Sequence, residues 1–415
     1  MCLKGIRCPE KIVEIMNLIY QKNMTTISGG NLSILDENGE IWITPSGVDK
    51  GNLHPEDIVR IGGSGEAAGR HSPSIELPFH VQIYKARPDV RAIIHAHPPA
   101  LIAASLVHKM PPLGISPVFR LKCGKIDVAE YALPGSGLLG ENIAEKFSQG
   151  CSAVILENHG VVAAGQTLDE VFSQFELLNS CADIAIKGAS YAALNELDDM
   201  QYGRLKKFFE LEKTYTGTTE YQKERKELFE LSRRIYGKGF SPSGFFLISC
   251  RTEDGRVLVS DPAKELRLLA EQDFVLLPGE ADPIMRIHGD IYERQPGVRS
   301  VIMALPPHTM GFACADKVFD SRLIPESYMV MREVKTVDYS ALLDNALPDM
   351  IERRSDVFLI KNAMTVVCGE SPLKAYDRLE VLEFSARAAD YARSLGDIFH
   401  IAGQDIEDIH RAFGI

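Results

Sequence analysis

The sequence lacks three features that would place the protein in a specialised class. None of its eight cysteines forms a Cys-x-x-Cys pair, and a chain of 415 residues is too large to depend on disulfides for its core. It has no apolar run long enough to span a bilayer, and its first residues contain no hydrophobic block of a signal peptide. We therefore expect reduced thiols, a cytoplasmic location and no membrane partner.

An excess of positive charge is also absent. The 45 Lys and Arg residues are outnumbered by 57 Asp and Glu residues, which gives a formal net charge of -12. This charge argues against a general nucleic-acid surface but does not exclude a local pocket for a small anion. The length exceeds that of one ordinary hydrophobic core and favours two domains. No stretch of the chain is low in complexity.

The sequence contains an internal duplication. The segment FHVQIYKARPDVRAIIHAHPP, from Phe79, matches IHGDIYERQPGVRSVIMALPP, from Ile287. Similarly, VILENHGVVAAG from Val154 matches FLIKNAMTVVCG from Phe358, and LIYQKNMTTISGGNLSI from Leu18 matches RIYGKGFSPSGFFLI from Arg234. A period of about 200 residues indicates duplicated domains and not a solenoid. We place the domains at residues 1–216 and 217–415.

Hydrophobic spacing predicts a mixture of helices and strands in each copy. In the first copy we expect helices over 10–22, 76–87 and 167–194, a hairpin over 31–47, and buried strands over 91–99 and 152–160. Thr167, with Glu170 three residues later, is typical of a helix N-cap. The elements do not alternate strictly, so we expect an α/β protein with a mixed sheet in each copy. A charged segment, 195–228, joins the copies.

Two histidines, His95 and His97, stand at the end of the apolar run RAIIHAHPP. Because alternate residues of a strand point to the same face, both imidazoles would face one point and suit one transition metal. His159, after the second buried strand, is a candidate third ligand, and Glu76 supplies a carboxylate at the start of a helix. A His-x-His pair also occurs as a surface or hydrogen-bonded pair.

The second copy strengthens the metal interpretation. It retains the residues around these four positions but holds none of the four polar groups, and the aligned residues are Ile284, Met303, Leu305 and Ala363. Four independent structural residues would not be expected to disappear together while their neighbours stayed. We infer that they form one site, which the second copy lacks.

Together, the motifs GGNLSI, TPSG, PSIELPFH, HAHPP and ENHGVVAAG resemble the class II aldolase and adducin family. This family includes L-fuculose-1-phosphate aldolase and L-ribulose-5-phosphate 4-epimerase. The resemblance covers nearly all of residues 8–215, and it continues through the second copy as a degenerate member without metal ligands. It implies two tandem α/β/α domains, each with a mixed, largely antiparallel central sheet.

The resemblance also implies roles for individual residues. His95, His97 and His159 would hold a divalent metal, zinc in most members, with manganese, cobalt or nickel as alternatives. Glu76 would be the catalytic carboxylate. A substrate phosphate would be bound, without a basic patch, by small polar residues and backbone N–H groups at Ser28, Asn31, Ser46, Gly47 and Ser74. Ile75 replaces a second serine of the aldolase, so a weaker phosphate pocket or a different ligand is an alternative.

The aldolases take a proton-donating tyrosine from a neighbouring subunit. The matching position holds Ile115 in the first copy and Tyr328 in the second. Our hypothesis is that two chains self-associate as a homodimer that forms a pseudo-tetramer. Each metal site would lie at a junction between a first and a second copy and would be completed by Tyr328. The alternative is that Tyr328 is a packing aromatic.

The leading interpretation is a metal-dependent aldolase that acts on a small sugar phosphate. It would cleave a ketose 1-phosphate, or a deoxy or otherwise modified relative, to dihydroxyacetone phosphate and an aldehyde. A metal stabilises the enediolate formed on cleavage, and a nearby carboxylate moves the proton at carbon. The alternatives are a sugar-phosphate 4-epimerase, a decarboxylase of a phosphorylated keto acid, and an adducin-like binding module without catalysis.

Overall fold

The structure is a computed structural model that describes residues 7–352 and 356–414. The chain divides into two compact units: Met1–Pro111 with Lys122–Ala182, and Pro112–Leu121 with Asp183–Ile415. These units are defined by the contacts between residues. The domain bounds 1–216 and 217–415 are defined by the sequence repeat and stay a prediction. Among the described residues, no helix is both long enough and apolar enough to cross a membrane. None of the described cysteines forms a disulfide.

Within its described residues, the first unit contains an eight-stranded sheet in the order β4-β3-β2-β1-β5-β8-β7-β6. Strands β6 and β7 are parallel, and the other described pairs are antiparallel. The strands are β1 (Asn31–Leu35), β2 (Ile41–Ile43), β3 (Val59–Ile61), β4 (Ala67–Ala68), β5 (Ala92–Ala96), β6 (Ile126–Ala129), β7 (Ala153–Leu156) and β8 (Val161–Gly165).

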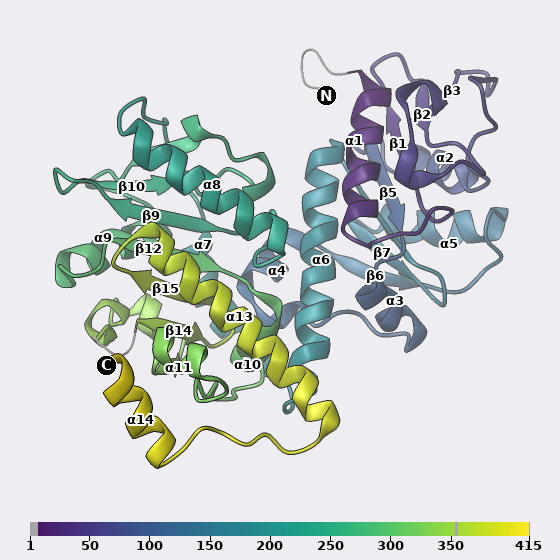
Figure 1. The fold of residues 1–415 in the computed structure, drawn as a ribbon. Helices are drawn as coiled ribbons and strands as arrows, with labels where there is room; N and C mark the ends of the chain where they lie inside the picture. The colour runs from purple at the N-terminus through teal and green to yellow at the C-terminus, as the bar shows by residue number, and fades with distance from the viewer. Residues whose placement is uncertain (1–6, 353–355, 415) are drawn as a thin grey trace. The chain divides into compact units, whose positions relative to one another are not determined.

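Helices cover both faces of this sheet (Figure 1). On one face, α2 and α5 pack against alternate strand residues such as Ile93 and Val154, through side chains that include Ile83 and Phe147. On the other face, α1 and α6 are joined by an ion pair between Lys22 and Glu176. The helices that contribute to this unit are α1 (Cys8–Gln21), α2 (Leu77–Ala86), α3 (Pro99–Leu106), α5 (Gly137–Ser148) and α6 (Leu168–Ala189), with short turns η1 (Lys50–Asn52) and η2 (Pro55–Asp57).

The second unit repeats this topology. Its described residues form a seven-stranded sheet in the order β11-β10-β9-β12-β15-β14-β13, which matches β3-β2-β1-β5-β8-β7-β6. The parallel pair β13 and β14 corresponds to β6 and β7. The strands are β9 (Leu247–Arg251), β10 (Val257–Ser260), β11 (Phe274–Leu276), β12 (Ser300–Ala304), β13 (Val334–Val337), β14 (Val357–Ile360) and β15 (Met364–Gly369). The prediction of an α/β protein with two mixed, largely antiparallel sheets is therefore confirmed.

In the second unit, α13 lies along β12 and β15, and α8 lies along β9 (Figure 1). The helices and turns that contribute to this unit are η3 (Leu113–Ile115), α4 (Pro117–Cys123), α7 (Asp199–Phe209), α8 (Gln222–Lys238), η4 (Leu266–Leu268), η5 (Glu271–Asp273), α9 (Pro283–Arg294), α10 (Pro307–Cys314), α11 (Pro325–Met331), α12 (Ser340–Leu343), η6 (Leu347–Met350), α13 (Pro372–Leu395) and α14 (Gln404–Phe413).

Several predicted bounds differ from the structure, and the strand predicted over 152–160 is the shorter β7, which ends at Leu156. His97 lies just past β5 and not within it, because Pro98 has no N–H for the ladder and the His97 N–H donates to the Met24 carbonyl instead. Helix α6 ends at Ala189 and not at residue 194, since the Ser190 hydroxyl donates to the carbonyl of Lys187 and turns the chain. The charged joining segment is not a plain linker, because it folds into α7 and the start of α8.

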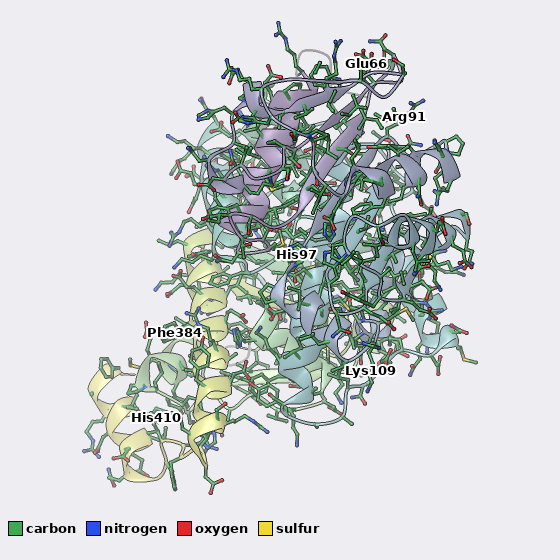
Figure 2. All side chains as sticks on the ribbon, turned by 90° about the vertical axis from the view of Figure 1, so that its right-hand side faces the viewer. Glu66, Arg91, His97, Lys109, Phe384 and His410 are labelled. Carbon is green, nitrogen blue, oxygen red and sulfur yellow. The ribbon has the colours of Figure 1, made fainter. Side chains whose placement is uncertain are left out.

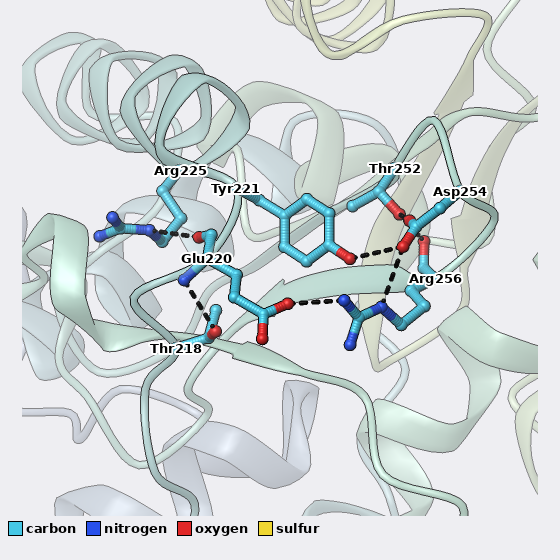
Figure 3. Close-up of polar contacts among 7 residues, drawn as sticks. All are labelled: Thr218, Glu220, Tyr221, Arg225, Thr252, Asp254 and Arg256. Atoms are coloured by element: carbon cyan, nitrogen blue, oxygen red, sulfur yellow. Dashed lines mark hydrogen bonds and ion pairs between the residues drawn. The ribbon is translucent and has the colours of Figure 1, made fainter.

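The start of α8 is fixed by the polar network drawn in Figure 3. Tyr221 precedes the helix in the left-handed region, with φ 56°, which is uncommon for a bulky residue. Its hydroxyl donates to the Asp254 carboxylate over 2.7 Å. Arg256 contacts the same carboxylate at 3.2 Å, contacts Glu220 at 2.6 Å, and lies over the Tyr221 ring. These contacts hold the unusual backbone conformation in place.

Both units contain the same buried polar triad. In the first, the Ser33 hydroxyl lies 2.7 Å from His80 Nδ1 and 2.7 Å from the Tyr84 hydroxyl. In the second, Ser249 makes the same two contacts with His288 and Tyr292, again at 2.7 Å. Burial lowers the pKa of His288 to about 3, so this imidazole is neutral at physiological pH. Each triad links the first strand of the repeat to the helix beneath the sheet.

We predict that Ser249→Ala destabilises the protein. The change leaves His288 Nδ1 and the Tyr292 hydroxyl without a partner in the core, and His288 Nε2 already has none. The expected loss in the free energy of unfolding is about 1–3 kcal/mol, measured by urea denaturation. Ser394→Ala, on an exposed part of α13, is the control and should change it by less than about 0.5 kcal/mol. Equal effects of the two variants would contradict the role of the triad.

Candidate metal centre

Three histidines of the first unit meet at one end of its sheet. His95 is on β5, His97 follows that strand, and His159 lies in the turn between β7 and β8. The turn is closed by the Leu156 N–H, which donates to the Gly160 carbonyl, and Asn158 adopts the left-handed conformation within it. Because β5 and β8 are neighbours, this turn carries His159 to the end of β5.

The three imidazoles form a compact cluster. One nitrogen from each ring can be chosen so that all three atoms lie within 4.8 Å of one another. The ring centroids of His95 and His97 are 4.7 Å apart, and those of His95 and His159 are 4.9 Å apart. Nitrogens bound to one zinc ion lie about 3–3.5 Å apart, so a small closure of the side chains brings them to one ion.

The protonation of the cluster suits metal ligands, which must be neutral imidazoles. Burial lowers the pKa of both His95 and His97 to about 3, and the neighbouring histidines contribute in the same direction. Burial also lowers the pKa of His159, against the opposing effect of Glu76. The Val161 carbonyl accepts a hydrogen bond from His95 Nδ1 over 3.0 Å, which leaves Nε2 without a proton and without a partner. These residues therefore fit a bound metal ion.

Glu76 faces the cluster from the N-terminal end of α2. Its side-chain oxygens lie 3.3 Å from His95 Nε2 and 3.5 Å from His159 Nε2, and the residue is 6% exposed. Oxygen Oε1 is buried and has no hydrogen-bond partner among the described residues. Burial of a carboxylate is costly unless hydrogen bonds or a cation compensate its lost hydration. The site therefore contains an incompletely partnered carboxylate beside three neutral nitrogen donors.

A chain of hydrogen bonds holds the other carboxylate oxygen. Asn31 Nδ2 donates to Glu76 Oε2 over 2.6 Å, and Asn31 Oδ1 lies 2.5 Å from His80 Nε2. Since a carbonyl oxygen only accepts, His80 carries its proton on Nε2 and accepts at Nδ1 from the Ser33 hydroxyl. The Tyr84 hydroxyl then donates to Ser33. Every hydrogen bond of this series is donated in the direction of Glu76, so the series fixes the Glu76 carboxylate as a hydrogen-bond acceptor.

Sequence reasoning missed most of this supporting structure. His80 and Tyr84 have counterparts in both copies, which is a visible signal, but their contact with Asn31 depends on tertiary packing. The need for glycine at position 160 was missed as well. A Cβ there would lie 2.5 Å from the His97 ring and 2.8 Å from the Ala96 carbonyl. Gly29 is equally restricted, since its Cβ would lie 2.8 Å from His97 Nδ1.

The residues proposed for phosphate binding lie on neighbouring loops. An isolated bridge between Pro45 and Pro73 pairs the loop of Ser46 with the loop of Ser74, and the Ser74 hydroxyl accepts from the Glu76 N–H over 3.2 Å. The buried Lys50, which sequence reasoning missed, ties the loops together. Its N–H donates to the Ile27 carbonyl, and its ammonium donates to the Pro45 carbonyl. Burial lowers the pKa of Lys50.

The remaining predicted phosphate-binding residues have different surroundings. Ser28 and Gly47 are exposed, and Gly47 has φ 69°. The amide of Asn31 is buried and already contacts Glu76 and His80. Ile75, by contrast, is 67% exposed. The phosphate-binding role of all five residues stays a prediction.

The corresponding end of the second sheet is apolar. The positions of the three histidines hold Met303, Leu305 and Ala363, which are all completely buried. Leu247 lies opposite Met303, just as Asn31 lies opposite His95. Asp282 occupies the position of Ser74, and its carboxylate accepts hydrogen bonds from the Tyr215 hydroxyl and from the N–H groups of the preceding segment, at Glu212 and Lys213.

Tyr328 lies on α11 in the second unit. Its hydroxyl is 2.8 Å from Nε2 of His410 on α14, and the two rings are stacked. His410 is labelled in Figure 2. No sequence pattern predicts this contact, because the two residues are 82 positions apart along the chain. The catalytic role of Tyr328 stays a prediction.

Comparison with known proteins agrees with this geometry. The profile of the Class II Aldolase and Adducin N-terminal domain matches residues 10–186 and again residues 226–389. A 3-oxo-tetronate 4-phosphate decarboxylase of Pectobacterium atrosepticum is 32% identical over 182 residues, which cover 43% of this chain and 83% of that protein. An L-fuculose phosphate aldolase of Methanococcus maripaludis is 32% identical over 174 residues, which cover 42% of this chain and 93% of that protein.

A third relative is the 5-deoxy-D-ribulose 1-phosphate aldolase of Bacillus thuringiensis. It is 31% identical over 204 residues, which cover 48% of this chain and 94% of that protein. Each of these relatives therefore matches about half of the chain, whereas the family profile matches both halves. With this match and two sheets of the same topology, the chain belongs to the class II aldolase and adducin family, and it contains two domains of that family.

Proposed function

We propose that the protein is a metal-dependent lyase that cleaves a ketose 1-phosphate, or a deoxy or modified relative, to dihydroxyacetone phosphate and an aldehyde. The observation that carries this proposal is the convergence of three neutral imidazoles and Glu76 at one end of the first sheet. Zinc is the metal we favour, with manganese, cobalt or nickel as alternatives that the same ligands accept.

A bound divalent metal would act as a Lewis acid that stabilises the negative charge of the enediolate. The protein's own residues supply the remaining chemistry. The Val161 carbonyl orients His95, and Asn31 holds Glu76 Oε2, so that Oε1 is the oxygen available to exchange a proton with the substrate carbon. The loops around Ser46 and Ser74 would hold the phosphate and fix the reacting carbon near Glu76.

A second candidate is the decarboxylation of a phosphorylated 3-oxo acid. It is favoured by the likeness to the 3-oxo-tetronate 4-phosphate decarboxylase and by Ile75, which departs from the aldolase pattern. Both reactions break a carbon–carbon bond and leave its electron pair on an enolate, which Glu76 can protonate. They differ in the departing group, which is an aldehyde in one case and carbon dioxide in the other.

We further propose that the second copy is a degenerate domain and that two chains form the pseudo-tetramer described above. The proposal of a degenerate second copy is supported by its buried apolar residues Met303, Leu305 and Ala363, which stand at the positions of the three histidines. In the proposed assembly, Tyr328 would accept the hydroxyl proton that the substrate loses as the aldehyde forms, and would return it in the reverse condensation, at a metal site to which a first copy contributes the histidines.

The first prediction from this proposal concerns metal content. Protein purified without a histidine tag should contain about one divalent ion per chain, and His95→Ala with His97→Ala should abolish binding because two of three ligands are lost. Inductively coupled plasma mass spectrometry measures this directly. The matched control is His54→Ala with His71→Ala, which removes two histidines of the first unit that lie outside the cluster. Two ions per chain would contradict the degenerate second copy, and none would contradict the metal centre.

The second prediction concerns Glu76. Glu76→Gln keeps an oxygen for Asn31 but removes the group that exchanges the proton, so kcat should fall by about 10²–10⁴-fold while metal content stays unchanged. The assay follows dihydroxyacetone phosphate from ketose 1-phosphates and carbon dioxide from phosphorylated 3-oxo acids. Glu66→Gln, on the exposed turn between β3 and β4 (Figure 2), is the control.

The product decides between the two reactions. Release of dihydroxyacetone phosphate supports the aldolase, and release of carbon dioxide alone supports the decarboxylase. Full activity of Glu76→Gln in either assay would contradict the role of the carboxylate.

The third prediction concerns Tyr328 and can be tested by complementation. Tyr328→Phe and the His95→Ala, His97→Ala variant should each be nearly inactive as homodimers. A heterodimer of the two, purified with different tags, should regain activity if a metal site takes its histidines from one chain and Tyr328 from the other. Tyr391→Phe, an exposed residue of the second unit, is the control. Full activity of Tyr328→Phe alone would show a packing role instead.

A further inference from the structure

The second unit contains a cavity that the proposed reaction does not use. Helices α7 and α9 and the segment around residues 342–345 enclose a volume of about 460 Å³, which is within the usual range of small-molecule sites. None of the residues that line it belongs to the histidine cluster or to the phosphate-binding loops.

Three cationic side chains line this cavity. Arg204 and Lys207 lie one turn apart on α7, and Arg286 lies on α9. All three are exposed, and none of them forms an ion pair with another described residue. The only carboxylate of the lining is Asp290, one turn from Arg286. In a chain with a net charge of -12, three cations therefore lie around one small volume, with Asp338 near Arg204 and Asp290 in the lining as the neighbouring carboxylates. A bound anion would relieve the mutual repulsion of the three cations.

The other lining residues indicate what the uncharged part of a ligand would contain. Phe208, Ile287 and Leu342 are buried and form an apolar wall. Asn345 has φ 54°, and its side-chain oxygen is buried without a hydrogen-bond partner among the residues that the structure describes. Its backbone carbonyl accepts from Arg294, which holds the residue in place. The Asn345 amide oxygen and the Asp290 carboxylate are both acceptors, so they suit a ligand that carries hydroxyl groups.

In the first unit, the matching helix face is covered by α5. Gln82 of α2 occupies the position of Asp290, and its side chain packs against Gly140 of α5, where an added Cβ would lie 2.6 Å from Gln82 Oε1. In the second unit this helix face instead meets α7, which brings Arg204 and Lys207 to the cavity. The packing that forms the cationic cavity therefore differs from that of the matching helix in the first unit.

We propose that this cavity binds a small phosphorylated polyol. Arg204, Lys207 and Arg286 would hold the phosphate, since guanidinium groups bind phosphate oxygens in pairs and an ammonium adds a point charge. Asp290 and Asn345 would accept hydrogen bonds from the hydroxyl groups. The site does not depend on the proposed lyase activity, so either can fail without the other.

Chemical protection of Lys207 tests the proposal at the cavity itself. The protein is treated with acetic anhydride, and the acetylation rate of each lysine is followed by peptide mass spectrometry. Ribose 5-phosphate, used as the probe, should slow acetylation of Lys207 several-fold. The exposed Lys223 and Lys317 of the same unit are internal controls and should be unaffected. Ribose, and sodium chloride at matched ionic strength, should give no protection.

Substitution of the two arginines completes the test. Arg204→Gln with Arg286→Gln removes two charge-assisted contacts and should weaken the protection by about 10-fold or more. Lys223→Gln with Lys317→Gln removes the same charge elsewhere and should leave it unchanged. Absence of protection at about 10 mM probe, which corresponds to less than about 3 kcal/mol of binding, would overturn the proposal. So would protection that persists in the arginine variant, or equal protection by inorganic phosphate, which would exclude recognition of the polyol.

Discussion

The site depends on one electrostatic constraint, which is a buried carboxylate whose nearest partners are neutral. Glu76 lies against His95 and His159, and burial keeps both imidazoles uncharged. A carboxylate removed from water is stable only if hydrogen bonds and a cation compensate the loss of hydration. Asn31 compensates one oxygen, and the other is left for a metal ion or a proton of the substrate. The same imbalance makes the site suited to a divalent cation and to proton transfer.

The two copies separate what the fold needs from what the chemistry needs. The Ser-His-Tyr triad occurs in both with the same distances, so it serves the packing of the repeat. In the first copy the chain of hydrogen bonds continues through Asn31 to Glu76. In the second it stops at His288, whose Nε2 is buried without a partner because Leu247 replaces the asparagine. The metal centre is thus an extension of a structural network that the second copy retains only in part.

Much of the fold and of the metal cluster could be predicted from the sequence. Periodicity located α1, α2 and β5, and the loss of His95, His97 and His159 from the second copy identified them as a set. The supporting contacts could not be predicted, since His80 reaches Asn31 only through the packing of α2 beneath β1. The position of His97 beyond β5 depends on the backbone contact with Met24. Arg204 and Lys207 were assigned to a linker, because their charge gave no sign of the helix that brings them to a cavity.

The second unit differs from the first at both places where we propose that an anion binds. At the start of α9, Asp282 stands where the first copy has Ser74, and it accepts hydrogen bonds from Tyr215 and from the backbone of Glu212 and Lys213. We infer that this internal carboxylate takes the place that a phosphate would need, because a second negative charge there would be repelled. One turn further along the same helix, Arg286 faces the cationic cavity. If both proposals hold, substitutions at neighbouring positions of one helix close its N-terminal end to anions and open its outer face to them.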